Sequence, residues 1–143
     1  MPGQPPSRLG QVESFEAFRR LTKPKPKAPT PAYAELVAAT NYSFLRGASR
    51  PEEMVLQAAL YELQAIGIAD RNTLAGVVQA KIAFGHKEFP EWKPKLLIGS
   101  RLVFSDGTPE IVAYPQDRAA YGRLTRLLTV GNRRAEKGKC ILS

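Results

Sequence analysis

Residues 63–80 read LQAIGIADRNTLAGVVQA, and this stretch decides the fold class. AIGIA (65–69) is short, apolar and flanked by polar residues, which is typical of a buried parallel strand. Asn72 or Thr73 then starts a helix that stops around Gly85. Its inner face is predicted to carry Leu74, Val77, Val78, Ile82 and Phe84. A strand followed directly by a helix is the repeating unit of an α/β fold.

The segment before this unit predicts another one. YAELVAA (33–39) reads as a strand, and NYSFLRGAS follows it as a loop. Ser49 as the cap, Pro51 in the first turn and Glu52 as the return half of a capping box predict a helix through about Leu63.

The segment after the central unit predicts a hairpin and a third helix. Residues 95–104 read as a strand, SDGT as a turn and PEIVAY as the antiparallel partner. Asp117 caps a helix whose inward side chains are predicted to be Tyr121, Leu124, Leu127 and Leu128. KCIL at the end resembles the start of a further strand, so the sequence predicts an α/β fold that stops part-way.

The first 31 residues differ from the rest in composition. Seven of the twelve prolines lie there, and KPKPKAPTP (23–31) alternates lysine with proline. We therefore expect two parts: a Pro/Lys-rich, disordered extension over 1–31 and a folded unit over 32–143. No apolar run approaches the ~20 residues of a membrane helix, and the N-terminus lacks a secretory signal. With a single cysteine, these features lead us to expect a cytoplasmic protein that does not bind a membrane.

The net charge of +8 is concentrated at the two ends of the chain. Residues 1–31 contain six basic and two acidic side chains, and residues 117–143 contain seven and two. Segregated positive charge favours a polyanionic partner, although ordinary solvated surface charge explains it equally well. The candidate contacts to a DNA backbone are Lys23, Lys25, Lys27, Arg133, Arg134, Lys137 and Lys139.

Four motifs in order make the chain recognisable: YAELVAATNYSFLRGASRPEEMVLQAA, LQAIGIADRNTLAGVVQA, LLIGSRLVFSDG and YGRLTRLLTVGNRRAEKGKC. They resemble the start of the PHP (polymerase and histidinol phosphatase) domain of bacterial C-family DNA polymerases, and most of all the error-prone paralogue of the alpha subunit. The resemblance covers about residues 32–143. It implies the first half of a seven-stranded β/α barrel with mostly parallel strands, at the N-terminus of a much larger polymerase.

The resemblance also identifies where metal-binding relatives hold their metals. Their His-x-His pair corresponds to Val37 and Ala39, their Asp-His pair to Asp70 and Arg71, and their glutamate to Arg101. Apolar side chains offer a cation no lone pair, and guanidinium groups repel it. The sequence therefore predicts that this chain holds no metal and that the metal site is degenerate.

The two arginines leave three interpretations open. Arg71 and Arg101 pair with Asp70 and replace the metals by an internal salt-bridge network, or they bind phosphate, or they are ordinary exposed arginines. A further departure lies at Tyr61-Glu62, where relatives usually have Leu-Gly at the end of the first helix. Glutamate there predicts a strained left-handed residue or a different helix end.

These observations predict a metal-free structural and interaction module of an error-prone DNA polymerase. The parent would carry out DNA-directed DNA synthesis in damage-induced translesion repair, with Mg²⁺ held outside this chain. This chain alone, without catalytic residues or cofactor, is expected to be inactive. The expected partners are DNA through the parent, other polymerase domains and mutasome-type accessory proteins. The alternatives are a metal-dependent phosphoesterase or 3'-5' exonuclease of the PHP family, and a stand-alone basic nucleic-acid-binding module.

Overall fold

The computed structural model describes residues 32–143, so the predicted extension over 1–31 lies outside the described residues. Strands and helices alternate as the sequence predicts. In chain order the elements are β1 (Ala34–Ala38), α2 (Pro51–Leu60), β2 (Ala65–Arg71), α3 (Ala75–Ala83), β3 (Lys95–Leu102), β4 (Ile111–Ala113) and α4 (Arg118–Arg133). Among these residues no helix has the length and apolar character needed to cross a lipid bilayer.

The four strands form one open sheet in the order β1-β2-β3-β4. β1, β2 and β3 run parallel, and β4 pairs antiparallel with β3. β2 and β3 stay in register over their whole length, from Ala65 opposite Lys95 to Arg71 opposite Arg101. This arrangement confirms the predicted α/β fold of mostly parallel strands, laid out as in the first half of a β/α barrel.

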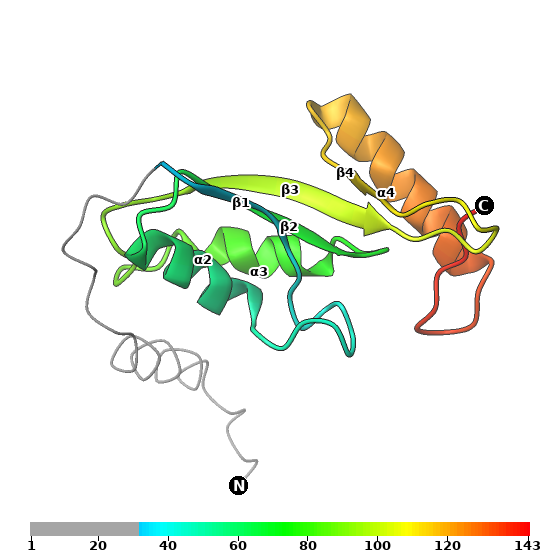
Figure 1. Cartoon of the computed structure of the whole chain (residues 1–143), viewed down its shortest axis with the longest axis horizontal. Coiled ribbons are helices and arrows are strands. Elements are labelled where there is room, and N and C mark those ends of the chain that lie inside the picture. Colours follow the sequence, from blue (N-terminus) through cyan, green and yellow to red (C-terminus); the bar gives the residue numbers. More distant parts are fainter. Residues whose placement is uncertain (1–31) are drawn as a thin grey trace, which may run out of the picture.

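α2 and α3 both cover the same face of the sheet (Figure 1). The core between them contains Val55 and Leu56 of α2, Ile66 and Ile68 of β2, and Ala80 of α3, each no more than 3% exposed. Burial of such side chains is the main stabilising contribution, at roughly 1.5–3 kcal/mol for each large aliphatic group. This layer therefore fixes the positions of the three parallel strands and of the loops that follow them.

α4 packs beside the end of the sheet through a second, smaller core. Asp117 caps it as predicted, accepting a hydrogen bond of 2.7 Å from the amide of Ala120. Leu124 and Leu128 are buried with Leu102 of β3 and with Leu142 near the C-terminal end of the described residues. Tyr121 and Leu127, predicted to face inward, are instead more than a third exposed, because this core takes only one narrow side of the helix.

The segment KCIL is not a strand, contrary to the prediction. It is irregular and is fixed by hydrogen bonds from the amide of Ile141 to the carbonyl of Gly131 and from the amide of Ser105 to the carbonyl of Leu142. Gly131 has no room for a side chain, since a Cβ there would lie 2.6 Å from the Cys140 Sγ. The final residues therefore connect the end of α4 to the segment after β3.

Two details of the helices also differ from the predictions. Arg50, not Ser49, is the N-cap of α2, and its amide donates to the carboxylate of Glu53 rather than Glu52. α3 begins at Ala75, later than predicted, and it buries small residues against α2. Val78 and Ile82, predicted to lie inside, are therefore 61% and 62% exposed.

The end of α2 agrees with the prediction at Tyr61-Glu62. Glu62 has a φ of 52°, in the left-handed region that favours glycine. Its amide donates to the carbonyl of Ala59, and the amide of Leu63 donates to that of Ala58, which closes the helix. A non-glycine residue in this conformation costs about 1 kcal/mol.

Candidate functional site

Two of the five positions derived from the metal-binding relatives, Arg71 and Arg101, share one face of the sheet. Ala38 lies in register with Ile68, and both belong to the core beneath the helices. Val37 lies in the stretch of β1 where the register with β2 is irregular, and Ala39 follows the strand, so alternation assigns neither to a face. Residues one or three positions from Ile68 along β2 lie on the opposite face of the sheet, away from the helices. Arg71 and Arg101, which are register partners, belong to that same face. The sequence therefore brings two cationic side chains to the face away from the helices.

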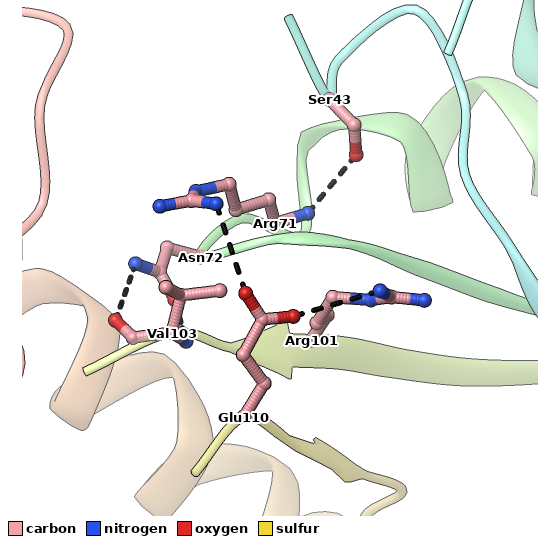
Figure 2. Close-up of polar contacts among 6 residues, drawn as sticks. All are labelled: Ser43, Arg71, Asn72, Arg101, Val103 and Glu110. Carbon is pink, nitrogen blue, oxygen red and sulfur yellow. Dashed lines mark hydrogen bonds and ion pairs between the residues drawn. The ribbon is translucent and has the colours of Figure 1, made fainter. Parts of the chain in front are cut away.

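The partner of both arginines is Glu110, just before β4 (Figure 2). The Glu110 carboxylate lies between the two guanidinium groups, 3.9 Å from Arg71 Nη1 and 3.6 Å from Arg101 Nη1. The predicted pairing of these arginines with Asp70 is therefore wrong. Sequence reasoning missed Glu110, although the predicted hairpin already placed it beside the end of β3.

Asp70 is instead a buried structural residue, only 1% exposed. Its carboxylate accepts hydrogen bonds from the Thr40 amide (2.7 Å), the Thr40 hydroxyl (2.7 Å) and the Ser43 hydroxyl (2.6 Å). Ser43 Oγ in turn accepts a bond of 3.0 Å from the amide of Arg71 (Figure 2). Asp70 therefore ties the loop after β1 to the end of β2. Asp70 and Arg71 are consecutive residues of β2, so their side chains point to opposite faces of the sheet. This alternation is the sequence signal that shows the two side chains cannot pair.

The residues present do not fit the metal site of the relatives. Val37 and Ala39 provide no donor atom, and Arg71 and Arg101 place positive charge where a cation would lie. The Asp70 carboxylate is already occupied by three protein donors. Within residues 32–143 no three His, Cys, Asp or Glu side chains lie close enough together to hold a metal ion.

A pocket of about 770 Å³ lies beside this face, where the loops after β1, β2 and β3 meet the end of α4. Lys137 and Lys139 line it, together with Arg71. Arg133 and Arg134, two other predicted DNA contacts, are exposed at the end of α4. Contact between these side chains and DNA stays a prediction. The other three predicted contacts, Lys23, Lys25 and Lys27, lie outside the described residues.

Tyr114 crosses the same face of the sheet, next to the two central strands. A Cβ on Gly99 would lie 2.5 Å from its ring, and a Cβ on Gly67 would lie 2.6 Å from its hydroxyl, so both glycines make room for it. The hydroxyl is buried and has no hydrogen-bond partner among the described residues. This burial, with a smaller contribution from the charge of Glu35, raises the pKa of Tyr114 above 10.0.

Comparison with known families gives a match over most of the described residues. Residues 35–140 match the PHP domain. The chain belongs to the PHP domain family. This assignment confirms the resemblance seen in the four sequence motifs and agrees with the α/β arrangement of the sheet.

Several relatives of this PHP domain carry the description "Error-prone DNA polymerase". Those from Rhodopseudomonas palustris strains BisB5 and BisA53 are 59% and 61% identical over 113 residues, which is 79% of this chain. The one from Caulobacter vibrioides is 56% identical over 113 residues. The chain spans about a tenth of the length of these curated relatives.

Among the solved structures similar to this PHP domain is one described as a proposed metal-dependent phosphoesterase from Bifidobacterium adolescentis. The TM-score is 0.48 at 23% sequence identity, over 75% of this chain and 37% of that one.

Proposed function

We propose that this chain is the N-terminal PHP domain of an error-prone DNA polymerase. The support is its 59% identity over 113 residues to a polymerase of that description. In this proposal the parent carries out DNA-directed DNA synthesis across damaged templates, with Mg²⁺ held by residues outside this chain. The domain itself contributes no group to nucleotidyl transfer.

Within that parent, the domain acts as a metal-free structural and interaction module. The observation that carries this part is the Arg71–Glu110–Arg101 bridge. By the resemblance, both arginines stand at positions where metal-binding relatives have metal ligands. The bridge joins the ends of β2 and β3 to the residue before β4 by charge pairing among protein groups. The bridge orients the two arginines, and the hydrogen bonds to Asp70 hold the loop after β1 to the end of β2 without a metal. This end of the sheet then presents a fixed surface to other polymerase domains or to mutasome-type accessory proteins.

The experiment is an exchange of domains between relatives. The matching 113 residues of the Rhodopseudomonas palustris BisB5 polymerase are replaced by those of this chain. We expect the chimera to extend a primer, on intact and on lesion-containing templates, at a rate close to that of the unmodified polymerase. The chain alone should extend no primer under the same conditions.

A second, matched chimera distinguishes a domain that fails to fold from a folded domain that is incompatible with the rest of the polymerase. It carries Leu56→Asp, which places a charge at a position 0% exposed in the core and should abolish folding of the domain. A folded, monodisperse chimera without that substitution that fails to extend primers contradicts the proposal.

A further inference from the structure

The pocket beside Arg71 combines aromatic and basic side chains. Apart from Arg71, neither the Arg71–Glu110–Arg101 bridge nor the proposed structural role uses them. The loop after β1 contributes Tyr42 and Phe44 to the pocket, and the segment after α4 contributes Lys137 and Lys139. In Figure 1 these two segments, cyan and red, lie at the same end of the sheet. Aromatic and basic side chains from separate parts of the chain therefore surround one hollow of about 770 Å³.

The charge of this pocket is positive. Its lining contains Arg71, Lys137 and Lys139 against the single acid Glu136. Lys139 Nζ lies 3.0 Å from the carboxylate of Glu136. Arg71 Nη1 lies farther from its own partner, 3.9 Å from the carboxylate of Glu110, which it shares with Arg101. Lys137 has no ion pair with a described residue. Arg71 and Lys137 are thus the cations best placed to receive an anionic ligand.

The aromatic part of the pocket is unusually open to solvent. Phe44 is 83% exposed and Tyr42 is 43% exposed, although both lie in a loop with many internal hydrogen bonds. A phenyl ring on a basic surface is a stacking platform for an unpaired base, since every base has a π-face. It has no comparable partner in a base-paired duplex, where the bases are already stacked.

The loop that carries Phe44 is held in one conformation. Ser43 donates to the buried Asp70, and its carbonyl accepts from the amides of Arg46 and Gly47. The amide of Asn41 donates to the carbonyl of Ser49, which closes the base of the loop. The backbone at Phe44 therefore does not need to be ordered when a ligand arrives, which lowers the entropic cost of binding.

We propose that this pocket binds single-stranded nucleic acid, with Phe44 stacking on a base and with Arg71 and Lys137 contacting the adjacent phosphates. Charge complementarity and the exposed ring select this occupant over an acidic peptide, which would use the cations and leave Phe44 uncovered. The inference goes beyond the proposed function, because it needs neither a polymerase nor any partner domain.

The test is fluorescence anisotropy of the full chain with a labelled oligothymidine of about 12 nucleotides, within the ~4–16 nucleotides that such single-strand sites cover. Phe44→Ala should weaken binding about tenfold, which is the size of one base stacked on an aromatic side chain. Phe44→Trp should restore it. Lys137→Gln should lower the slope of log affinity against log salt by about 0.7, the value for one phosphate contact on a single strand.

Two control variants and one control ligand make the result specific. Tyr61→Ala removes another exposed aromatic ring, at the end of α2, and Lys81→Gln removes an exposed cation of α3; both should bind like the unmodified chain. A duplex of equal phosphate number should bind more weakly than the single strand. Equal affinity for duplex and single strand, or no effect of Phe44→Ala, overturns the proposal. Because the assay needs no primer extension, its failure is distinct from failure of the domain exchange.

Discussion

Glu110 Oε2 lies 3.6 Å from Arg101 Nη1, while the other oxygen of the same carboxylate lies 3.9 Å from Arg71 Nη1. One negative charge is thus shared by two positive ones, on side chains that are between a third and a half exposed. Exposed pairs of this kind contribute about 0–1 kcal/mol each. The bridge therefore sets where the two guanidinium groups lie more than it stabilises the fold, and it leaves one positive charge in excess.

Glu110→Gln should separate these two effects. We expect the free energy of unfolding in urea to fall by less than about 1 kcal/mol, because the pairs are partly exposed. Affinity for the oligothymidine should rise at low salt, since Arg71 is released from its carboxylate, and the gain should vanish at high salt. Glu91→Gln is the control, because it removes one negative charge at an exposed site that does not line the pocket. A large loss of stability in Glu110→Gln alone would show that the bridge is a principal stabilising element.

Asp70→Asn should be far more damaging, because Asp70 is buried and accepts three hydrogen bonds. The amide keeps the shape but places an N–H group against a donor, so we expect a loss of about 2–3 kcal/mol in the free energy of unfolding. Asp106→Asn makes the same change on an exposed turn and should have a much smaller effect. Similar urea midpoints for the two variants would contradict the structural role of Asp70.

Gly47→Ala should distort the loop that carries Phe44. A Cβ at Gly47 would lie 2.2 Å from the carbonyl oxygen of Thr40 and 2.7 Å from that of Ala39. The backbone has to shift, at a cost of about 1–3 kcal/mol. Gly122→Ala is the matched control: nothing lies within 4 Å of its Cβ position on α4, so we expect a gain of about 0.5–1 kcal/mol from helix propensity. Thermal denaturation of both variants should therefore give shifts of opposite sign.

Tyr114→Phe should stabilise the domain, because it removes a buried hydroxyl that has no partner among the described residues. The expected gain is about 1 kcal/mol in the free energy of unfolding. The raised pKa of Tyr114 adds a pH dependence. The neutral phenol is favoured in the folded state, so its contribution is complete below the unfolded pKa of about 10 and is lost as the pH rises through the higher folded value.

The same variant should flatten the alkaline side of the stability profile. Urea unfolding between pH 8 and pH 11 measures how the free energy of unfolding depends on pH. This range spans the ordinary tyrosine pKa of about 10. Tyr121→Phe, on α4, is the control for a partly exposed phenol. A destabilised Tyr114→Phe would mean that the hydroxyl makes a hydrogen bond in solution.

The basic segment before the folded unit gives a further prediction. Replacing Lys23, Lys25 and Lys27 with glutamine should reduce the salt dependence of oligonucleotide binding if these lysines form an electrostatic tether. It should leave the preference for single-stranded over duplex ligand unchanged, since that preference belongs to Phe44. An unchanged salt slope assigns the three lysines to solubility alone.

The sequence predicts the sheet well, because each strand is a short apolar run bounded by polar residues. In-register pairing of β2 with β3 then brings Arg71 to Arg101 without any tertiary information beyond strand order. The interpretation that pairs the two arginines with Asp70 failed because it considered only their opposite charges. Consecutive residues of a strand lie on opposite faces, so Asp70 and Arg71 point apart. Val78 and Ile82 were mispredicted because helical periodicity does not say which of two apolar stripes faces the sheet.

The pocket could not be predicted in the same way. Tyr42 and Phe44 line one pocket with Lys137 and Lys139 only because α4 packs beside β3 through Leu124 and Leu128. These residues are almost 100 positions apart, and no local pattern specifies how a helix at the edge of a sheet is placed. The predicted basic contacts were therefore assigned by charge alone, without the aromatic side chains that complete the site.

We propose that cationic and apolar side chains stand in this PHP domain at the positions that match the metal ligands of metal-binding relatives. The most direct test is isothermal titration of Mn²⁺ and of Zn²⁺ into the chain after removal of metals with a chelator. We predict no stoichiometric binding, because Val37 and Ala39 donate no electron pair, Arg71 and Arg101 repel cations, and the Asp70 carboxylate is occupied by Thr40 and Ser43. One-to-one binding with micromolar affinity that disappears in Asp70→Asn would contradict the account.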